Sequence, residues 1–174
     1  DTLPLHAGYR ADPTTGAVAV PIYQTTSYQF DSAEHAANLF GLKELGNIYT
    51  RIMNPTNDVL EKRVAALEGG VGALAVSAGS AAINYAVLTI AQQGNNIVSA
   101  PLLYGGTYTL FAHMFARLGI ETRFAEDGSA ESLEKLIDEK TSMVFCESIS
   151  NPVGAILDME AIAVDTEYWV VSKN

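Results

Sequence analysis

The sequence predicts an α/β protein in which a mostly parallel sheet is flanked by helices. From residue 56 onward, short apolar runs alternate with amphipathic stretches of helical length, which is typical of strand–helix–strand units. The 174 residues are 48% hydrophobic and 17% charged, as in a folded domain. Residues 1–57 instead carry turn signals without a sustained helical period, so we expect an extended N-terminal arm that contacts a neighbouring subunit.

Apolar periodicity places the elements in order along the chain. Leu60, Val64 and Leu67 lie on one helical face, with Thr56 or Asn57 as the candidate N-cap. The remaining predicted elements are helices around residues 83–90, 110–118 and 133–137 and strands at residues 73–76, 97–98, 122–124 and 143–146.

Composition and charge exclude several classes of function. Ten Lys and Arg against twenty Asp and Glu give a net charge of -10, which argues against nucleic-acid binding because that affinity comes largely from clustered basic residues. No run approaches the roughly 18 apolar residues that span a bilayer, and no secretory signal pattern is visible, so we expect a cytoplasmic protein. Cys146 is the only cysteine and the histidines lack metal-ligand spacing, so no disulfide or metal site is expected.

Polar clusters follow three of the predicted strands, at residues 77–80, 104–107 and 147–152. Ligands of parallel sheets bind beyond the carboxyl ends of the strands, so we expect one composite site. In the first cluster, the amides of Gly79 and Ser80 open a predicted helix, whose free N–H donors and positive end suit a phosphate. The alternative is an ordinary strand-to-helix turn capped by a serine.

Three aromatic or basic residues are further candidates for ligand contacts. In the arm, Arg51 could bind a phosphate bidentately and Tyr49 could donate its hydroxyl. The alternative is a surface arginine stacked on a neighbouring aromatic ring. Tyr104 follows a predicted strand and precedes two glycines, so it could present its ring to a planar ligand or simply close the core.

Seven short motifs follow one another between about His6 and Ile162. They are residues 21–28 (PIYQTTSY), 49–51 (YTR), 54–56 (NPT), 67–70 (LEGG), 77–82 (SAGSAA), 103–108 (LYGGTY) and 147–152 (ESISNP). Together they resemble the Cys/Met-metabolism family of pyridoxal-phosphate (PLP) enzymes. Residues 35–43 (HAANLFGLK) and 46–48 (GNI) are most similar to the O-acetylhomoserine sulfhydrylases of that family. Methionine-cleaving gamma-lyases carry a cysteine where this chain has Gly106, which counts mildly against that branch.

The resemblance implies the aspartate aminotransferase-like type I fold of PLP-dependent transferases, represented here in truncated form. Residues 1–57 would be the arm and residues 58–174 part of the PLP-binding domain. The implied reaction is gamma-replacement, in which O-acetylhomoserine and sulfide give homocysteine and acetate for methionine biosynthesis. A cytoplasmic homotetramer, built as a dimer of dimers, is the implied assembly. Cystathionine gamma-synthase and the cystathionine or methionine gamma-lyases remain alternatives.

The resemblance also implies roles for individual residues. Gly79 and Ser80 would bind the cofactor phosphate through their backbone N–H groups, and Tyr49 and Arg51 would reach the same phosphate across a subunit interface. Tyr104 would stack on the pyridine ring and assist proton transfer or departure of the leaving group. One further contact follows from the last motif: Asn151 would lie near the cofactor's 3-hydroxyl and the substrate carboxylate.

The family also needs a lysine that holds PLP as a Schiff base and a carboxylate against the pyridine nitrogen. From about Ala163 the sequence departs from the family pattern that supplies both. Lys173 follows an apolar run, and Asp165 faintly resembles the missing aspartate motif. Their close spacing leaves no room for the dozen or so residues of a parallel crossover. Three interpretations stay open: Lys173 is the Schiff-base lysine, the polypeptide continues past Asn174, or the chain is a catalytically silent fragment without that lysine.

Overall fold

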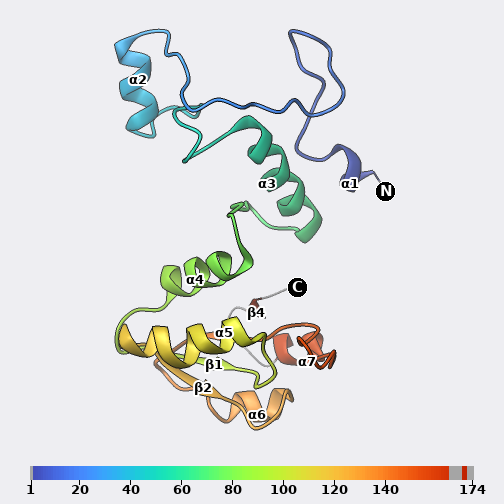
Figure 1. Ribbon diagram of the computed structural model, residues 1–174, viewed down its shortest axis with the longest axis vertical. Coiled ribbons are helices and arrows are strands. Elements are labelled where there is room, and N and C mark those ends of the chain that lie inside the picture. The colour runs from blue at the N-terminus through green and yellow to red at the C-terminus, as the bar shows by residue number, and fades with distance from the viewer. Residues whose placement is uncertain (1, 165–169, 172–174) are drawn as a thin grey trace. The chain divides into compact units, whose positions relative to one another are not determined.

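The computed structural model describes residues 2–164 and 170–171 (Figure 1). The chain divides into two compact units, one ending at Ala75 and the other beginning at Val76. None of the helices described is both long enough and apolar enough to cross a membrane.

The first unit contains helices α1 (Leu3–His6), α2 (Ala33–Phe40) and α3 (Pro55–Glu68), joined by long extended segments. Helix α2 is absent from the elements predicted above. It has eight residues, and its N-cap Ser32 accepts the N–H of His35 at 3.0 Å. Only Leu39 of this helix is buried, so its apolar period is too short to stand out in the sequence.

Helix α3 confirms the predicted helix but begins earlier than expected. Its N-cap is Asn54, whose side chain accepts the N–H of Thr56 at 2.9 Å, so the prediction of Thr56 or Asn57 is wrong. Pro55 explains the shift, because proline lacks an N–H and its fixed φ suits the first helical position. Thr56 instead binds an earlier segment of the chain: its hydroxyl donates to Pro21 O at 2.8 Å and accepts the N–H of Tyr23 at 3.0 Å.

The second unit is built on a parallel sheet with strand order β2-β1-β3-β4. Its strands are β1 (Asn96–Ser99), β2 (Glu121–Phe124), β3 (Thr141–Phe145) and β4 (Val170–Val171). The strands expected at residues 97–98, 122–124 and 143–146 are confirmed, with the last one residue shorter at its end. The strand expected at residues 73–76 is wrong: within the described part of the chain this run joins no ladder. A strand forms only where a neighbouring strand accepts and donates its backbone hydrogen bonds. In this run the N–H of Ala75 donates to a side chain, Glu61 Oε1, at 2.8 Å.

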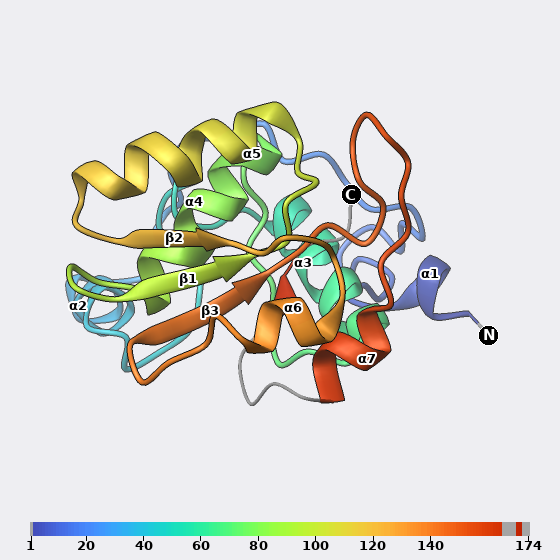
Figure 2. The same cartoon turned by 90° about the horizontal axis from the view of Figure 1, so that it is seen from below.

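Helices cover both faces of this sheet (Figure 2). One face carries α4 (Gly79–Ile90) and α5 (Gly105–Thr109), which continues into the π-helical turn η1 (Leu110–Phe115). The other face carries α6 (Ala130–Glu134) and α7 (Met159–Val164). Alternate strand residues fill two cores: Ile97, Met143 and Phe145 pack on the first face, and Val98, Val144 and Cys146 on the second. The continuous apolar runs of the sequence reflect this double burial.

A polar network joins Arg123 of β2 to the amino ends of β1 and β3. Asn96 Nδ2 donates to Asp138 Oδ1 at 2.8 Å, and Thr141 Oγ1 donates to Asn96 Oδ1 at 2.8 Å. Arg123 Nη1 donates to Asp138 Oδ2 at 2.7 Å. Hydrogen bonds from Arg123 and then Asn96 hold the pKa of Asp138 well below its usual range. These hydrogen bonds link β2 to the amino ends of β1 and β3.

Candidate functional site

The carboxyl ends of the strands and the first turns of two helices meet at one edge of the second unit. In Figures 1 and 2, α4 and α5 both begin on the side toward which the strand arrows point. The polar clusters at residues 104–107 and 147–152 follow β1 and β3, and the cluster at residues 77–80 opens α4. The structure thus brings the three predicted clusters to the ligand-binding edge of a parallel sheet.

Helix α4 begins without a side-chain cap. Its N-cap is Ala78, in extended backbone, and Ala81 and Ala82 donate their N–H groups back to Ala78 O at 3.0 and 3.1 Å. Within the described residues, the exposed amides of Gly79 and Ser80 have no hydrogen-bond acceptor. A Cβ added at Gly79 would meet no atom within 4 Å. No serine caps this turn, so the first donors of a 12-residue helix are open to an anion.

Tyr104 lies at the N-cap of α5 with its side chain half exposed, so it does not close the core. Its backbone N–H donates to Oε1 and Oε2 of Glu147, both at 3.1 Å. Glu147 lies two residues past Phe145, the buried last residue of β3, and is itself only 1% exposed. The Tyr104 ring lies against Gly106, where an added Cβ would sit 2.6 Å from Cε1. One side of the ring is therefore supported while the rest is accessible.

Asn151 lies in a loop that folds back after β3. Ile149 and Ile156 form an antiparallel bridge, and Ser150 N–H donates to Ala155 O at 2.9 Å. Gly154 has a φ of 73°, a left-handed conformation that glycine adopts without strain. The loop leaves Asn151 exposed, and its side chain forms no hydrogen bond with any described residue. Its amide is available to a ligand at the edge where Tyr104 lies.

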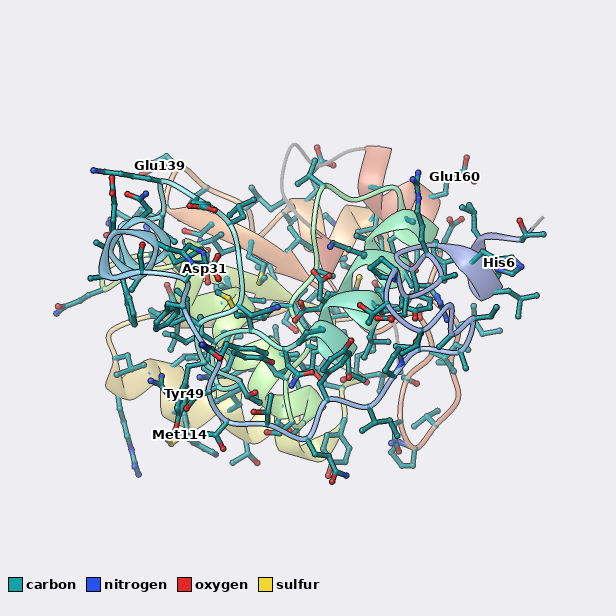
Figure 3. All side chains as sticks on the ribbon, turned by 90° about the horizontal axis from the view of Figure 1, so that it is seen from above. His6, Asp31, Tyr49, Met114, Glu139 and Glu160 are labelled. Carbon is teal, nitrogen blue, oxygen red and sulfur yellow. The ribbon has the colours of Figure 1, made fainter. Side chains whose placement is uncertain are left out.

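Tyr49 and Arg51 belong to the first unit. Tyr49 forms an antiparallel bridge with Ser27, and the next residue extends the pairing through Thr50 N–H to Thr26 O at 2.9 Å. The Arg51 guanidinium carbon lies 5.6 Å from the centre of the Tyr49 ring, a cation–π contact. Both side chains are exposed, and Tyr49 is labelled in Figure 3. The structure thus shows the stacked arrangement and gives Arg51 no ion pair with any described residue.

The other titratable residues do not assemble a metal site. His6 and Asp31, the partner of His35, lie at opposite ends of the first unit in Figure 3. No group of three His, Cys, Asp or Glu in the part of the chain that the structure describes is able to hold a metal ion. Burial raises the pKa of the Cys146 thiol to about 11, which fits a core residue. Lys173 and Asp165 lie outside the described residues.

The contact between Glu147 and Tyr104 was not predicted from the sequence. In the sequence, Glu147 stands out only as the first residue of a polar cluster. The available signal is a carboxylate placed directly after an apolar strand, with no Lys or Arg among its near neighbours in the chain. Buried carboxylates need a hydrogen-bond donor, so a glutamate in this position predicts an N–H or O–H donor close to it.

Known proteins resemble this chain over nearly all of its length. Residues 1–168 match the family described as Cys/Met metabolism PLP-dependent enzyme. The chain is 59% identical over 164 residues to O-acetyl-L-homoserine sulfhydrylase 1 of Thermus thermophilus. The aligned region covers 94% of this chain and 39% of that protein. The chain is 50% identical over 164 residues to homocysteine/cysteine synthase of Saccharomyces cerevisiae, covering 93% and 37%. The chain thus spans about two fifths of the length of the curated relatives it matches.

Solved structures agree with these relatives. A crystal structure from Campylobacter jejuni, assigned as an O-acetylhomoserine (thiol)-lyase and containing N'-pyridoxyl-lysine-5'-monophosphate, has a TM-score of 0.91 at 44% identity and covers 99% of this chain and 43% of its own. Cystathionine gamma-lyase from Lactobacillus plantarum has a TM-score of 0.84 at 28% identity, covering 97% and 42%. The predicted type I fold of PLP-dependent transferases is confirmed. The chain belongs to the Cys/Met metabolism family of PLP-dependent enzymes.

Proposed function

We propose that this chain contributes to a PLP-dependent enzyme that catalyses gamma-replacement on O-acetylhomoserine. The γ-carbon–oxygen bond breaks, acetate leaves, and sulfide forms the new carbon–sulfur bond of homocysteine. The observation that carries this proposal is the set of relatives named O-acetyl-L-homoserine sulfhydrylase or homocysteine/cysteine synthase, at 50–59% identity over at least 93% of this chain. The reaction would serve methionine biosynthesis.

The start of α4 fits the phosphate of PLP. Gly79 and Ser80 offer two backbone N–H donors at the positive end of a helix dipole. The absence of a side chain at Gly79 lets the backbone approach the anion closely. Because the chain carries a net charge of -10, its overall field repels phosphate, and local donors must hold it. Arg51, with Tyr49 beneath it, would add a bidentate contact from a neighbouring protomer.

Tyr104 and Asn151 would act on the cofactor ring and the substrate. The accessible part of the Tyr104 ring is suited to stack on a planar ligand, and its hydroxyl can carry a proton toward the departing acetate. Asn151 offers an exposed amide to the 3-hydroxyl of PLP and to the substrate carboxylate. When bound, PLP supplies the electron sink of the reaction, while these residues supply position and electrostatics.

We also propose that residues 1–57 are an arm that contacts a neighbouring subunit and that residues 58–174 belong to the PLP-binding domain. Exposed apolar side chains along the arm support this assignment, since such groups favour burial against another chain. They are Leu5, Val18, Ile22, Leu42 and Leu45, each at least 70% exposed. We propose a cytoplasmic homotetramer, built as a dimer of dimers, as the assembly that the arm helps to form. Sedimentation equilibrium of the native protein should give a tetramer, and a monomer would contradict the arm's role.

The reaction is tested on the native protein in two steps. Addition of PLP should produce the visible absorbance of bound cofactor, and O-acetylhomoserine with sulfide should then give homocysteine and one equivalent of acetate. A preference for O-succinylhomoserine with cysteine would instead indicate a cystathionine synthase, and cleavage of methionine or cystathionine a gamma-lyase. Failure to bind PLP would overturn the cofactor assignment itself.

A further inference from the structure

Glu147 takes the place of a helix cap for α5. The N-cap residue of this helix is Tyr104, whose phenol gives no cap hydrogen bond. In a capping box, a glutamate three residues into the helix accepts the N–H of the N-cap residue. The third residue here is Thr107, which has no carboxylate, and Glu147 from the end of β3 accepts that N–H instead, through both oxygens at 3.1 Å.

This contact does not resemble an ordinary stabilising ion pair. Glu147 is 1% exposed, and no Lys, Arg or His in residues 2–164 forms a salt bridge with it. Burying a carboxylate without a cation is unfavourable compared with burying an apolar side chain of similar size. The hydrogen bond instead holds the backbone of Tyr104 in a fixed position relative to the end of β3.

Gly106 determines where the Tyr104 ring can lie. A Cβ added at Gly106 would be 2.6 Å from Cε1, 3.2 Å from Cδ1 and 3.5 Å from Cζ of that ring. Gly106 has no positive φ, so its backbone accepts alanine and only the ring stands in the way. The adjacent Gly105 is different, because a Cβ there would meet no atom within 4 Å.

We propose that Glu147 and Gly106 are positioning residues that together set the orientation of the Tyr104 ring. Glu147 holds the backbone from which the ring projects, and Gly106 forms the surface on which the ring rests. The catalytic consequence rests on the proposed function, in which Tyr104 contacts the cofactor ring and the departing group. The geometric consequence, a ring displaced by any side chain at position 106, does not depend on it.

Gly106→Ala and Gly105→Ala form a matched pair for the test. Both replace a glycine in the first turn of α5 by alanine and so gain similar helix propensity. Only Gly106→Ala should displace the ring, by about 1 Å, since carbon atoms pack at roughly 3.5–4.0 Å. Crystal structures of both variants of the native protein, without substrate, report this directly. An unmoved ring in Gly106→Ala would overturn the proposal whether or not the protein has the proposed activity.

Kinetics test the same claim at the site. A misplacement of about 1 Å can lower the rate about 100-fold, so Gly106→Ala should lose about that factor in kcat. Gly105→Ala should stay within roughly threefold of the parent protein. Equal kcat values for the two variants would contradict the positioning role. A parent protein that binds no PLP would instead overturn the proposed function and leave the structural test standing.

Glu147→Gln and Glu147→Leu separate positioning from stability. Glutamine keeps an acceptor for the Tyr104 N–H and should retain kcat within roughly threefold, whereas leucine removes it and should lower kcat at least about tenfold. Leucine also removes a buried carboxyl, so the thermal midpoint should not fall in step with kcat. Parallel losses of kcat and thermal midpoint, or full activity in Glu147→Leu, would overturn the role assigned to Glu147.

Discussion

Phe111 links the helix that carries Tyr104 to the sheet, and its truncation gives a prediction with a definite magnitude. The side chain is fully buried in η1. Its ring centre lies 4.8 Å from that of Phe145 in an edge-to-face contact and 5.5 Å from that of Phe115. A buried Phe→Ala substitution costs about 3–5 kcal/mol, and two aromatic contacts, each worth roughly 0.5–1.5 kcal/mol beyond area burial, favour the upper half of that range for Phe111→Ala.

Met114→Ala is the matched control, because Met114 lies in the same π-helical turn but is 47% exposed. An exposed substitution of this kind usually changes stability by no more than about 0.5 kcal/mol. Urea unfolding followed by far-UV circular dichroism gives the free energies. Amide hydrogen exchange of β1 and β3 reports the second unit by itself, since the two units need not unfold together. A loss below about 3 kcal/mol for Phe111→Ala would refute the packing argument.

Three further predictions concern titration, reactivity and cofactor binding. The pKa of Asp138 is lowered in the folded protein from its ordinary value of 3.8. Its carboxylate therefore contributes its full stabilisation when the pH is above 3.8, and this contribution is lost as the pH falls toward the folded-state pKa. Asp138→Asn should therefore destabilise the protein more at neutral pH than below about pH 3, as measured by urea unfolding, and an equal loss at both would contradict the network. Cys146, with a pKa raised to about 11 by burial, should resist iodoacetamide in the native protein and react once urea unfolds it; rapid native alkylation would show an exposed thiol. Arg51→Ala should raise the dissociation constant of PLP about tenfold or more, because charge-assisted hydrogen bonds to the phosphate are lost. Arg117→Ala, a substitution of another exposed arginine, should leave that constant unchanged. Equal dissociation constants in the two variants would argue against the phosphate contact.

The sheet was predictable because its strands are buried on both faces. The apolar runs around Ile97 and Val144 have no polar alternation, and double burial of parallel strands produces this pattern. The run at residues 73–76 shows the limit of the argument. It has a similar apolar character, but a strand also requires a neighbour, and the sequence does not reveal which runs will find one.

The candidate site was predictable where local chain geometry creates it. Gly79 and Ser80 open a helix, and a helix start exposes N–H groups whatever lies around it. The Glu147–Tyr104 contact joins residues 43 positions apart, so it depends on how β1 and β3 pair. Likewise, the closeness of Gly106 to the Tyr104 ring depends on a side-chain rotamer that composition and periodicity do not encode.

The central claim is that the first amides of α4 bind the cofactor phosphate. A crystal structure of the native protein grown with PLP tests it most directly. Phosphate oxygens should lie at hydrogen-bond distance, roughly 2.7–3.2 Å, from the backbone nitrogens of Gly79 and Ser80. A phosphate bound elsewhere, with both amides still facing water, would contradict it.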